Sequence, residues 1–181
     1  MTTNEPALAS SDVDQSMEGL HARVGRLAAV VSGEHYPAAD RAALRRYAPQ
    51  QPVPLAFYRL WLRHLGTEPP LGSAVGAWAL IAWGLATGGP SAHRRDRPLG
   101  RCLAEAGYSE ARLERLLAAP EDDTRQALVA SMVRFLASKG EGFDWVQLAQ
   151  LVLLRDEARR EGLHQRIATD YYRQLASTHK E

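Results

Sequence analysis

The chain has 181 residues, of which 45% are hydrophobic and 24% charged, and its formal net charge is +1. This composition is typical of a soluble globular protein and excludes disorder along the whole length. The longest uncharged apolar run, residues 74–86, is shorter than the roughly 20 residues of a membrane-spanning helix. The single cysteine, Cys102, excludes an internal disulfide and any multi-cysteine metal site. The N-terminus resembles no secretory signal, so we expect a cytoplasmic protein without membrane contact.

Apolar residues follow a helical spacing almost everywhere, and no segment alternates as a β-strand does. Residues 1–15 are small, polar and acidic, which predicts a flexible tail. An N-terminal helical subdomain is expected over residues 16–90. The first predicted helix ends near Gly33, the second begins after Pro37, and the other two cover residues 55–65 and 73–86. The last of them is apolar on every side, so we expect it to be buried all round at the centre of this subdomain.

Residues 88–98 read GGPSAHRRDRP and lack any apolar period, which predicts a loop, with residues 91–98 as its basic part. A C-terminal helical bundle is expected over residues 99–181. The first predicted helix of this bundle covers residues 99–106, and the second begins after Ser109, its N-cap. The next runs from Pro120 to Lys139, and another begins after Asp144, its N-cap. The last contains Leu163, Ile167, Tyr171 and Leu175. The fold class is therefore all-α, with about eight helices in two small bundles.

The sequence contains none of the common catalytic motifs. It has no glycine-rich phosphate loop, zinc-type histidine pair, nucleophile elbow or dinucleotide fingerprint. Glu121, Asp122 and Asp123 resemble a metal motif, but Arg125 follows where another carboxylate is needed, and the start of a helix favours acidic residues without a metal. We therefore expect no metal, no cofactor and no enzymatic activity.

The charges are unevenly distributed along the chain. Between Arg41 and Arg101 there are nine arginines and two acidic residues, a local formal charge of +7, whereas the rest of the chain carries −6. Clustered cations are what the binding of a polyanion requires. A solvated surface of one sign gives the same count, and so does a basic patch that binds an acidic protein.

Three stretches resemble a known family. Residues 40–46 and 56–60 are similar to its arginine pair and its FYRL helix, and Leu99-Gly100-Arg101 with Leu113, Leu116 and Leu117 is similar to the start of its second subdomain. The last stretch comprises Phe143-Asp144-Trp145, Leu148-Ala149 and Asp170-Tyr171-Tyr172. In this order and spacing, over residues 39–61 and 99–172, the chain resembles the CasB family, the small subunit of the type I-E CRISPR surveillance complex Cascade.

The resemblance implies a non-catalytic helical protein, present as two copies in the complex, with crRNA, target DNA and other Cascade subunits as partners. It further implies a basic surface that stabilises the target strand and the displaced DNA strand of the R-loop during RNA-guided antiviral defence. The alternative is a helical protein-interaction or regulatory module with an acidic protein partner, and an unrecognised helical enzyme comes third.

Within that basic surface, the loop arginines are the favoured phosphate contacts, because the loop has nothing to place in a core. Arg59 is equally compatible with bracing the core beside Trp61, and Arg63 with plain solvation. The candidate nucleic-acid-binding residues are Arg45, Arg46, Arg59, Arg94, Arg95, Arg97, Arg101 and Arg134.

Overall fold

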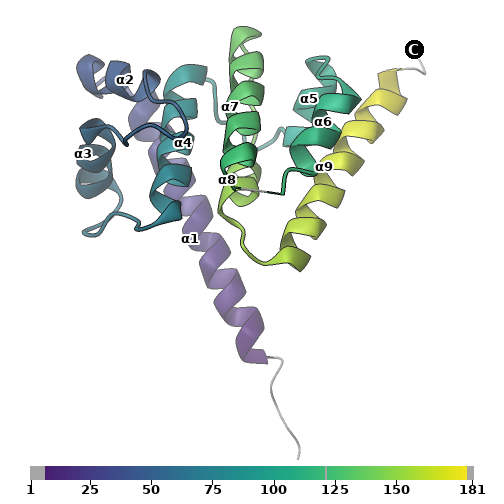
Figure 1. The fold of residues 1–181 in the computed structure, drawn as a ribbon, viewed down its shortest axis with the longest axis horizontal. Helices are drawn as coiled ribbons and strands as arrows, with labels where there is room; N and C mark the ends of the chain where they lie inside the picture. Colours follow the sequence, from purple (N-terminus) through teal and green to yellow (C-terminus); the bar gives the residue numbers. More distant parts are fainter. Residues whose placement is uncertain (1–6, 121, 179–181) are drawn as a thin grey trace, which may run out of the picture.

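The computed structural model describes residues 7–120 and 122–178, with side chains from residue 17 onward. Within these ranges the chain forms nine helices and no strand, so the predicted all-α fold is confirmed and the expected number of about eight was close (Figure 1). The helices are α1 (Ala7–Ser32), α2 (Ala38–Arg45), α3 (Leu55–His64), α4 (Ser73–Gly88), α5 (Leu99–Glu105), α6 (Glu110–Leu117), α7 (Asp122–Ser138), α8 (Trp145–Leu153) and α9 (Glu157–Thr178).

Helix α1 begins earlier than its apolar pattern predicts. Its backbone is helical from Ala7, so the expected tail over residues 1–15 overlaps the first turns of the helix, while residues 1–6 lie outside the described part of the chain. No glycine or proline occurs between Pro6 and Gly19. Because helix extension is cheap once the first turn has formed, a helix anchored by its apolar C-terminal half continues through such a segment.

Helix α4 is buried from Ala77 to Ala86, which confirms the prediction of a helix buried all round. It packs against α1 and α2 on one side and against α7 and α8 on the other (Figure 1). At Gly84 there is no space for a β-carbon, because the indole of Trp145 from α8 occupies it. The buried residues of both halves thus form one continuous cluster. A division into two subdomains at residues 91–98 stays a prediction.

The loop between α4 and α5 is fastened to the segment that precedes α8. The backbone N–H of Phe143 donates to Ala92 O at 3.0 Å, and that of Arg94 donates to Phe143 O at 2.9 Å. Trp145 Nε1 also donates to Ala92 O, at 2.9 Å. Ala92 is only 2% exposed, so the expectation that this loop has nothing to place in a core is wrong for that residue.

The two predicted helix caps have different outcomes. Asp144 lies at the N-cap of α8, and its carboxylate accepts a hydrogen bond from the backbone N–H of Val146 at 3.0 Å, as predicted. Ser109 does lie at the N-cap of α6, but its side chain makes no capping hydrogen bond. The sequence therefore predicts which residues occupy the N-cap positions here, but it does not predict whether their side chains make the capping hydrogen bond.

Helices α5 and α9 approach each other closely at Gly100. A β-carbon there would collide with the backbone carbonyl of Ile167 and lie 3.0 Å from the backbone nitrogen of Tyr171. The hydroxyl of Tyr171 donates to Tyr108 O at 2.7 Å, which ties α9 to the turn between α5 and α6. The packing of α5 against α9 therefore requires glycine at position 100.

The substitution Gly100→Ala is expected to lower the free energy of unfolding by about 1–3 kcal/mol or more, because the added methyl group forces α5 away from α9. Urea unfolding followed by circular dichroism measures the loss. Gly162→Ala on α9 is the matched control, since a β-carbon there would meet only the end of the Arg166 side chain, at 3.8 Å. Equal stability of the two variants would contradict the close approach.

Candidate nucleic-acid interface

The strongest concentration of positive charge lies on α2 and α3, which pack together at the left of Figure 1. Residues 38–64 contain five arginines and a single carboxylate, that of Asp40. We call these arginines the α2–α3 basic surface: Arg41, Arg45, Arg46, Arg59 and Arg63.

Two members of this surface hold helix ends together. Arg41 donates from Nε to Val31 O at 3.0 Å and from Nη2 to Gly33 O at 2.6 Å, at the end of α1. Arg45 donates from Nε to Ala86 O at 2.7 Å, in the last turn of α4. The last carbonyls of a helix lack intrahelical donors, so cations are favourable at these positions. Neither arginine is ion-paired to a carboxylate among the described side chains, so both retain an uncompensated charge.

The other three members are exposed, as Arg45 is too. Arg59 is 52% exposed and forms an ion pair with Asp40, whose hydrogen bond raises the pKa of Arg59 above its usual value. It does not bond to Trp61, whose Nε1 donates to the backbone carbonyl of Glu68 at 2.7 Å. Arg46 and Arg63 are exposed and form no ion pair with the side chains that the structure describes.

Two arginines of the predicted phosphate loop, Arg94 and Arg97, and Arg101 on α5 have carboxylate partners instead. Arg97 is 12% exposed, pairs with Glu105 at 2.6 Å and with Glu141, and donates to Gly142 O at 3.1 Å. Arg101 pairs with the same Glu105 at 2.7 Å. Arg94 pairs with Asp96 at 3.2 Å. The hollow that these side chains line contains three arginines and three carboxylates, so it is formally neutral: Arg94, Arg97, Arg101, Asp96, Glu105 and Glu141.

The remaining two candidates are exposed: Arg95 lies in the loop between α4 and α5, and Arg134 lies on α7. The guanidinium of Arg95 lies against α1 at Gly25, where a β-carbon would be 2.7 Å from Arg95 Nη2. Arg134 on α7 stacks over the ring of Trp83 at 5.1 Å from the centroid, a cation–π contact. The structure therefore does not gather all eight predicted arginines into one site.

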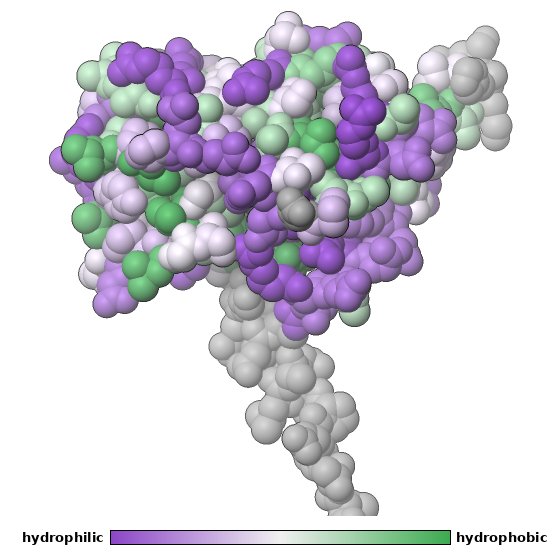
Figure 2. Space-filling view, viewed as in Figure 1, coloured by the Kyte–Doolittle hydropathy of each residue, from purple (hydrophilic) through white to green (hydrophobic). Residues whose placement is uncertain are grey.

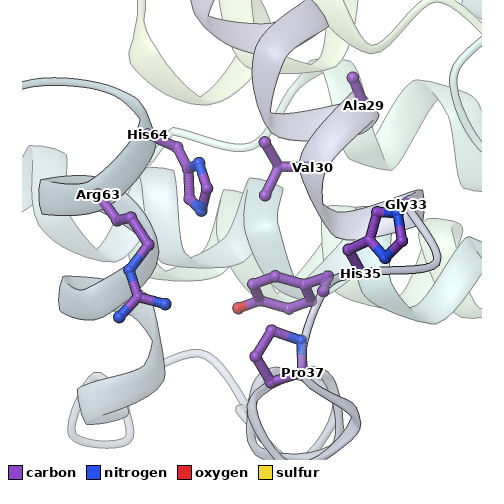
Figure 3. A pocket seen from close by; sticks show the side chains of 8 residues that line it. Ala29, Val30, Gly33, His35, Pro37, Arg63 and His64 are labelled. Atoms are coloured by element: carbon purple, nitrogen blue, oxygen red, sulfur yellow. The ribbon is translucent and has the colours of Figure 1, made fainter.

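A cavity that the sequence analysis missed lies beside the α2–α3 basic surface. It has a volume of about 330 Å³ and is lined by residues from the end of α1, the α1–α2 connection and the end of α3, shown in Figure 3. The only signal in the sequence is the cluster His35-Tyr36-Pro37, which joins two titratable rings to a turn residue. The contribution of α3 comes from far along the chain, so local patterns could not reveal the cavity.

Ion pairs hold one member of the acidic run at the start of α7. Asp122 is the first residue of α7 and pairs with Arg155 and, at 2.8 Å, with Arg125. These partners, Arg155 foremost, lower the pKa of Asp122. Glu121 lies outside the described residues. In the ranges that the structure covers, no group of three or more histidine, cysteine or acidic side chains is placed to bind a metal ion.

Two further features bear on the predicted chemistry. Cys102 is buried, and burial raises the pKa of its thiol to about 11, so the reactive thiolate form is disfavoured at neutral pH. Among the described helices, none combines the length and the apolarity that crossing a membrane would require.

The comparisons with known proteins give one match. The profile of the family described as CRISPR-associated protein Cse2 matches residues 40–172, from α2 to most of α9. No curated protein and no solved structure matches the chain. Members of the Cse2 family, also called CasB, are structural subunits that associate with the other components of Cascade. Because the match covers well over half of the chain, the protein belongs to the Cse2 family and is a small subunit of a CRISPR Cascade complex.

Proposed function

We propose that this subunit binds the DNA backbone in the R-loop, stabilising the target strand and the displaced single strand through the α2–α3 basic surface. The observation that carries the proposal is the local charge balance: five arginines and one carboxylate within residues 38–64. When a guide RNA opens a duplex, the exchange of base pairs is nearly balanced in energy, so additional phosphate contacts decide whether the open state persists. Clustered guanidinium groups supply such phosphate contacts whatever the base sequence of the DNA.

The role we propose involves no chemistry at the DNA. The described residues offer no cluster of metal ligands, and the buried Cys102 thiol is poorly suited to nucleophilic attack. The purified protein is expected to leave single-stranded and duplex DNA uncut, with or without divalent cations. In the complex we further propose crRNA and a second copy of the chain as partners, as the family resemblance implies.

A titration of single-stranded DNA at several salt concentrations tests the proposal. The double variant R46Q/R63Q removes two exposed charges that have no carboxylate partner among the described residues. It is expected to bind every sequence more weakly and to flatten the slope of log K against log salt by about 0.7 unit per lost contact.

The matched control is R94Q/R101Q, which removes the same charge from two arginines that are paired with carboxylates. Because Asp96 and Glu105 already neutralise these arginines, the salt slope of the control should stay close to that of the wild-type protein. Equal flattening in both double variants would show that the total charge, not the α2–α3 basic surface, governs binding.

The second candidate function for the α2–α3 basic surface is the binding of another protein. It is favoured by the exposed leucines of this part of the chain, Leu55 at 73%, Leu62 at 53% and Leu71 at 85%. Figure 2 shows green apolar patches among purple hydrophilic ones on the left of the view, over the region of α2 and α3. If the wild-type protein shows no salt-dependent DNA binding, this surface belongs to a protein partner.

A further inference from the structure

The cavity between α1 and α3 has an apolar floor and a basic rim. Ala29 and Val30 of α1 and Pro37 form the apolar part. In Figure 3, Arg63 and His64 at the end of α3 lie across the cavity from His35. No acidic side chain is among its lining residues. Its lining therefore suits a ligand with a flat or apolar body and an adjacent negative charge.

Tyr36 supplies an unused hydrogen-bonding group in this cavity. Its side chain lines the cavity and is only 7% exposed, and its hydroxyl oxygen is buried without any hydrogen-bond partner among the described residues. Buried polar groups in native proteins are nearly always paired, so an orphan beside a cavity points to a missing ligand atom. Burial raises the pKa of Tyr36 to about 12, so at neutral pH the hydroxyl retains its proton and can donate.

The walls of the cavity are fixed by contacts that do not involve a ligand. Arg41 bonds the last carbonyls of α1, and its guanidinium lies 5.8 Å from the centroid of the Tyr36 ring. Arg26 of α1 donates to the backbone carbonyl of His64 at 3.2 Å, which ties α1 to the end of α3. A cavity held on both sides in this way is available before a ligand arrives, which lowers the cost of binding.

We propose that this cavity holds one unstacked base of single-stranded DNA, with the base ring on the apolar floor, the Tyr36 hydroxyl donating to a base oxygen or nitrogen, and Arg63 contacting the adjacent phosphate. The inference rests on the proposed function, because Arg63 also belongs to the α2–α3 basic surface that would carry the strand. Proteins that bind single strands combine a cationic track with sites for individual bases. A free phosphate would leave the apolar floor unused.

Photocrosslinking with the full chain gives a direct test. Oligonucleotides with 5-iodouracil in place of thymine are bound, irradiated and digested, and the adduct is located by mass spectrometry. We expect an adduct on Tyr36, His35 or His64. The variant Tyr36→Phe, which removes only the hydroxyl, should unfold at no lower urea concentration than the wild-type protein yet bind the oligonucleotide more weakly.

A second pair of variants separates the base from the backbone. Ala29→Phe fills the cavity from an exposed position of α1, and Ala22→Phe, also exposed and two turns earlier on α1, is its matched control. The first should weaken binding by about five- to a hundredfold, the range found for the loss of one stacked base, with the salt slope unchanged. The second should bind like the wild-type protein.

The outcomes distinguish this inference from the proposed function. Salt-dependent binding that is unaffected by Ala29→Phe, with adducts only outside the cavity, would overturn the base site and leave the cavity to an aromatic side chain of another Cascade subunit. An absence of salt-dependent binding by the wild-type protein would instead overturn the proposed function.

Discussion

Replacing Trp145 with alanine is expected to lower the free energy of unfolding by about 3–5 kcal/mol, as truncations of buried aromatic residues do. Trp145 is 1% exposed, stacks on Phe143 with 5.0 Å between ring centroids, and occupies the space left open by Gly84. The substitution also removes the donor that bonds Ala92 O. It therefore opens a cavity between α4 and α8 and loosens the loop before α5 at the same time.

Urea unfolding monitored by circular dichroism measures this loss. Trp83→Ala on α4 is expected to cost a similar ~3–5 kcal/mol, because Trp83 is 2% exposed in the same core. Leu71→Ala is the control, since that apolar residue is 85% exposed, and surface changes usually stay within about 0.5 kcal/mol. A loss below about 1 kcal/mol for Trp145→Ala would mean that α4 and α8 do not share one core.

The helices were predictable because each has a local cause. Apolar spacing predicted the segments, and prolines and glycines marked their ends, so the order of elements from α2 to α9 agrees with the pattern. The burial of α4 followed from a segment with no polar face. The attachment of Ala92 to Phe143 was not predictable, because it joins residues far apart in sequence and neither belongs to a periodic segment.

The family resemblance depends on residues that build the fold rather than on those that would bind DNA. Gly100 permits α5 to approach α9, Phe143 and Trp145 stack in the core, and Tyr171 bonds the backbone of Tyr108. Even Arg45, half of the arginine pair, donates to the end of α4. A resemblance based on such residues identifies the family reliably but does not indicate which arginines contact the nucleic acid.

Charge counted along the chain was a poor guide to charge in space. The segment from Arg41 to Arg101 contains two acidic residues, but folding places Glu105 and Glu141 beside its loop residue Arg97. Glu141 is 44 positions from its partner Arg97, so no local count could include it. Among the described side chains the same folding adds no carboxylate to Arg46, Arg63 or Arg95. Only Arg95 of these three lies in the loop, so the expected interface moves from the loop to α2 and α3.

In the assembled Cascade complex, alanine at Arg46, Arg59 and Arg63 is expected to weaken binding of a matched duplex target by about ten- to a hundredfold. Base-pair exchange yields almost no net free energy, so the lost contacts reduce the stability of the open state directly. Arg45 is left unchanged because its bond to Ala86 O supports the fold. Gel-shift titrations with the complete complex measure the effect, and guide RNA loading should be unaffected.

A target that already contains a mismatched bubble provides the decisive comparison. Its strands are open before the complex binds, so the free energy of opening no longer has to be offset by contacts to the displaced strand. The triple variant should therefore recover most of its lost affinity on the bubble target, while R94Q/R101Q behaves like the wild-type subunit on both targets. If the triple variant bound the bubble as poorly as the duplex, the α2–α3 basic surface would instead be holding the guide RNA or a neighbouring subunit.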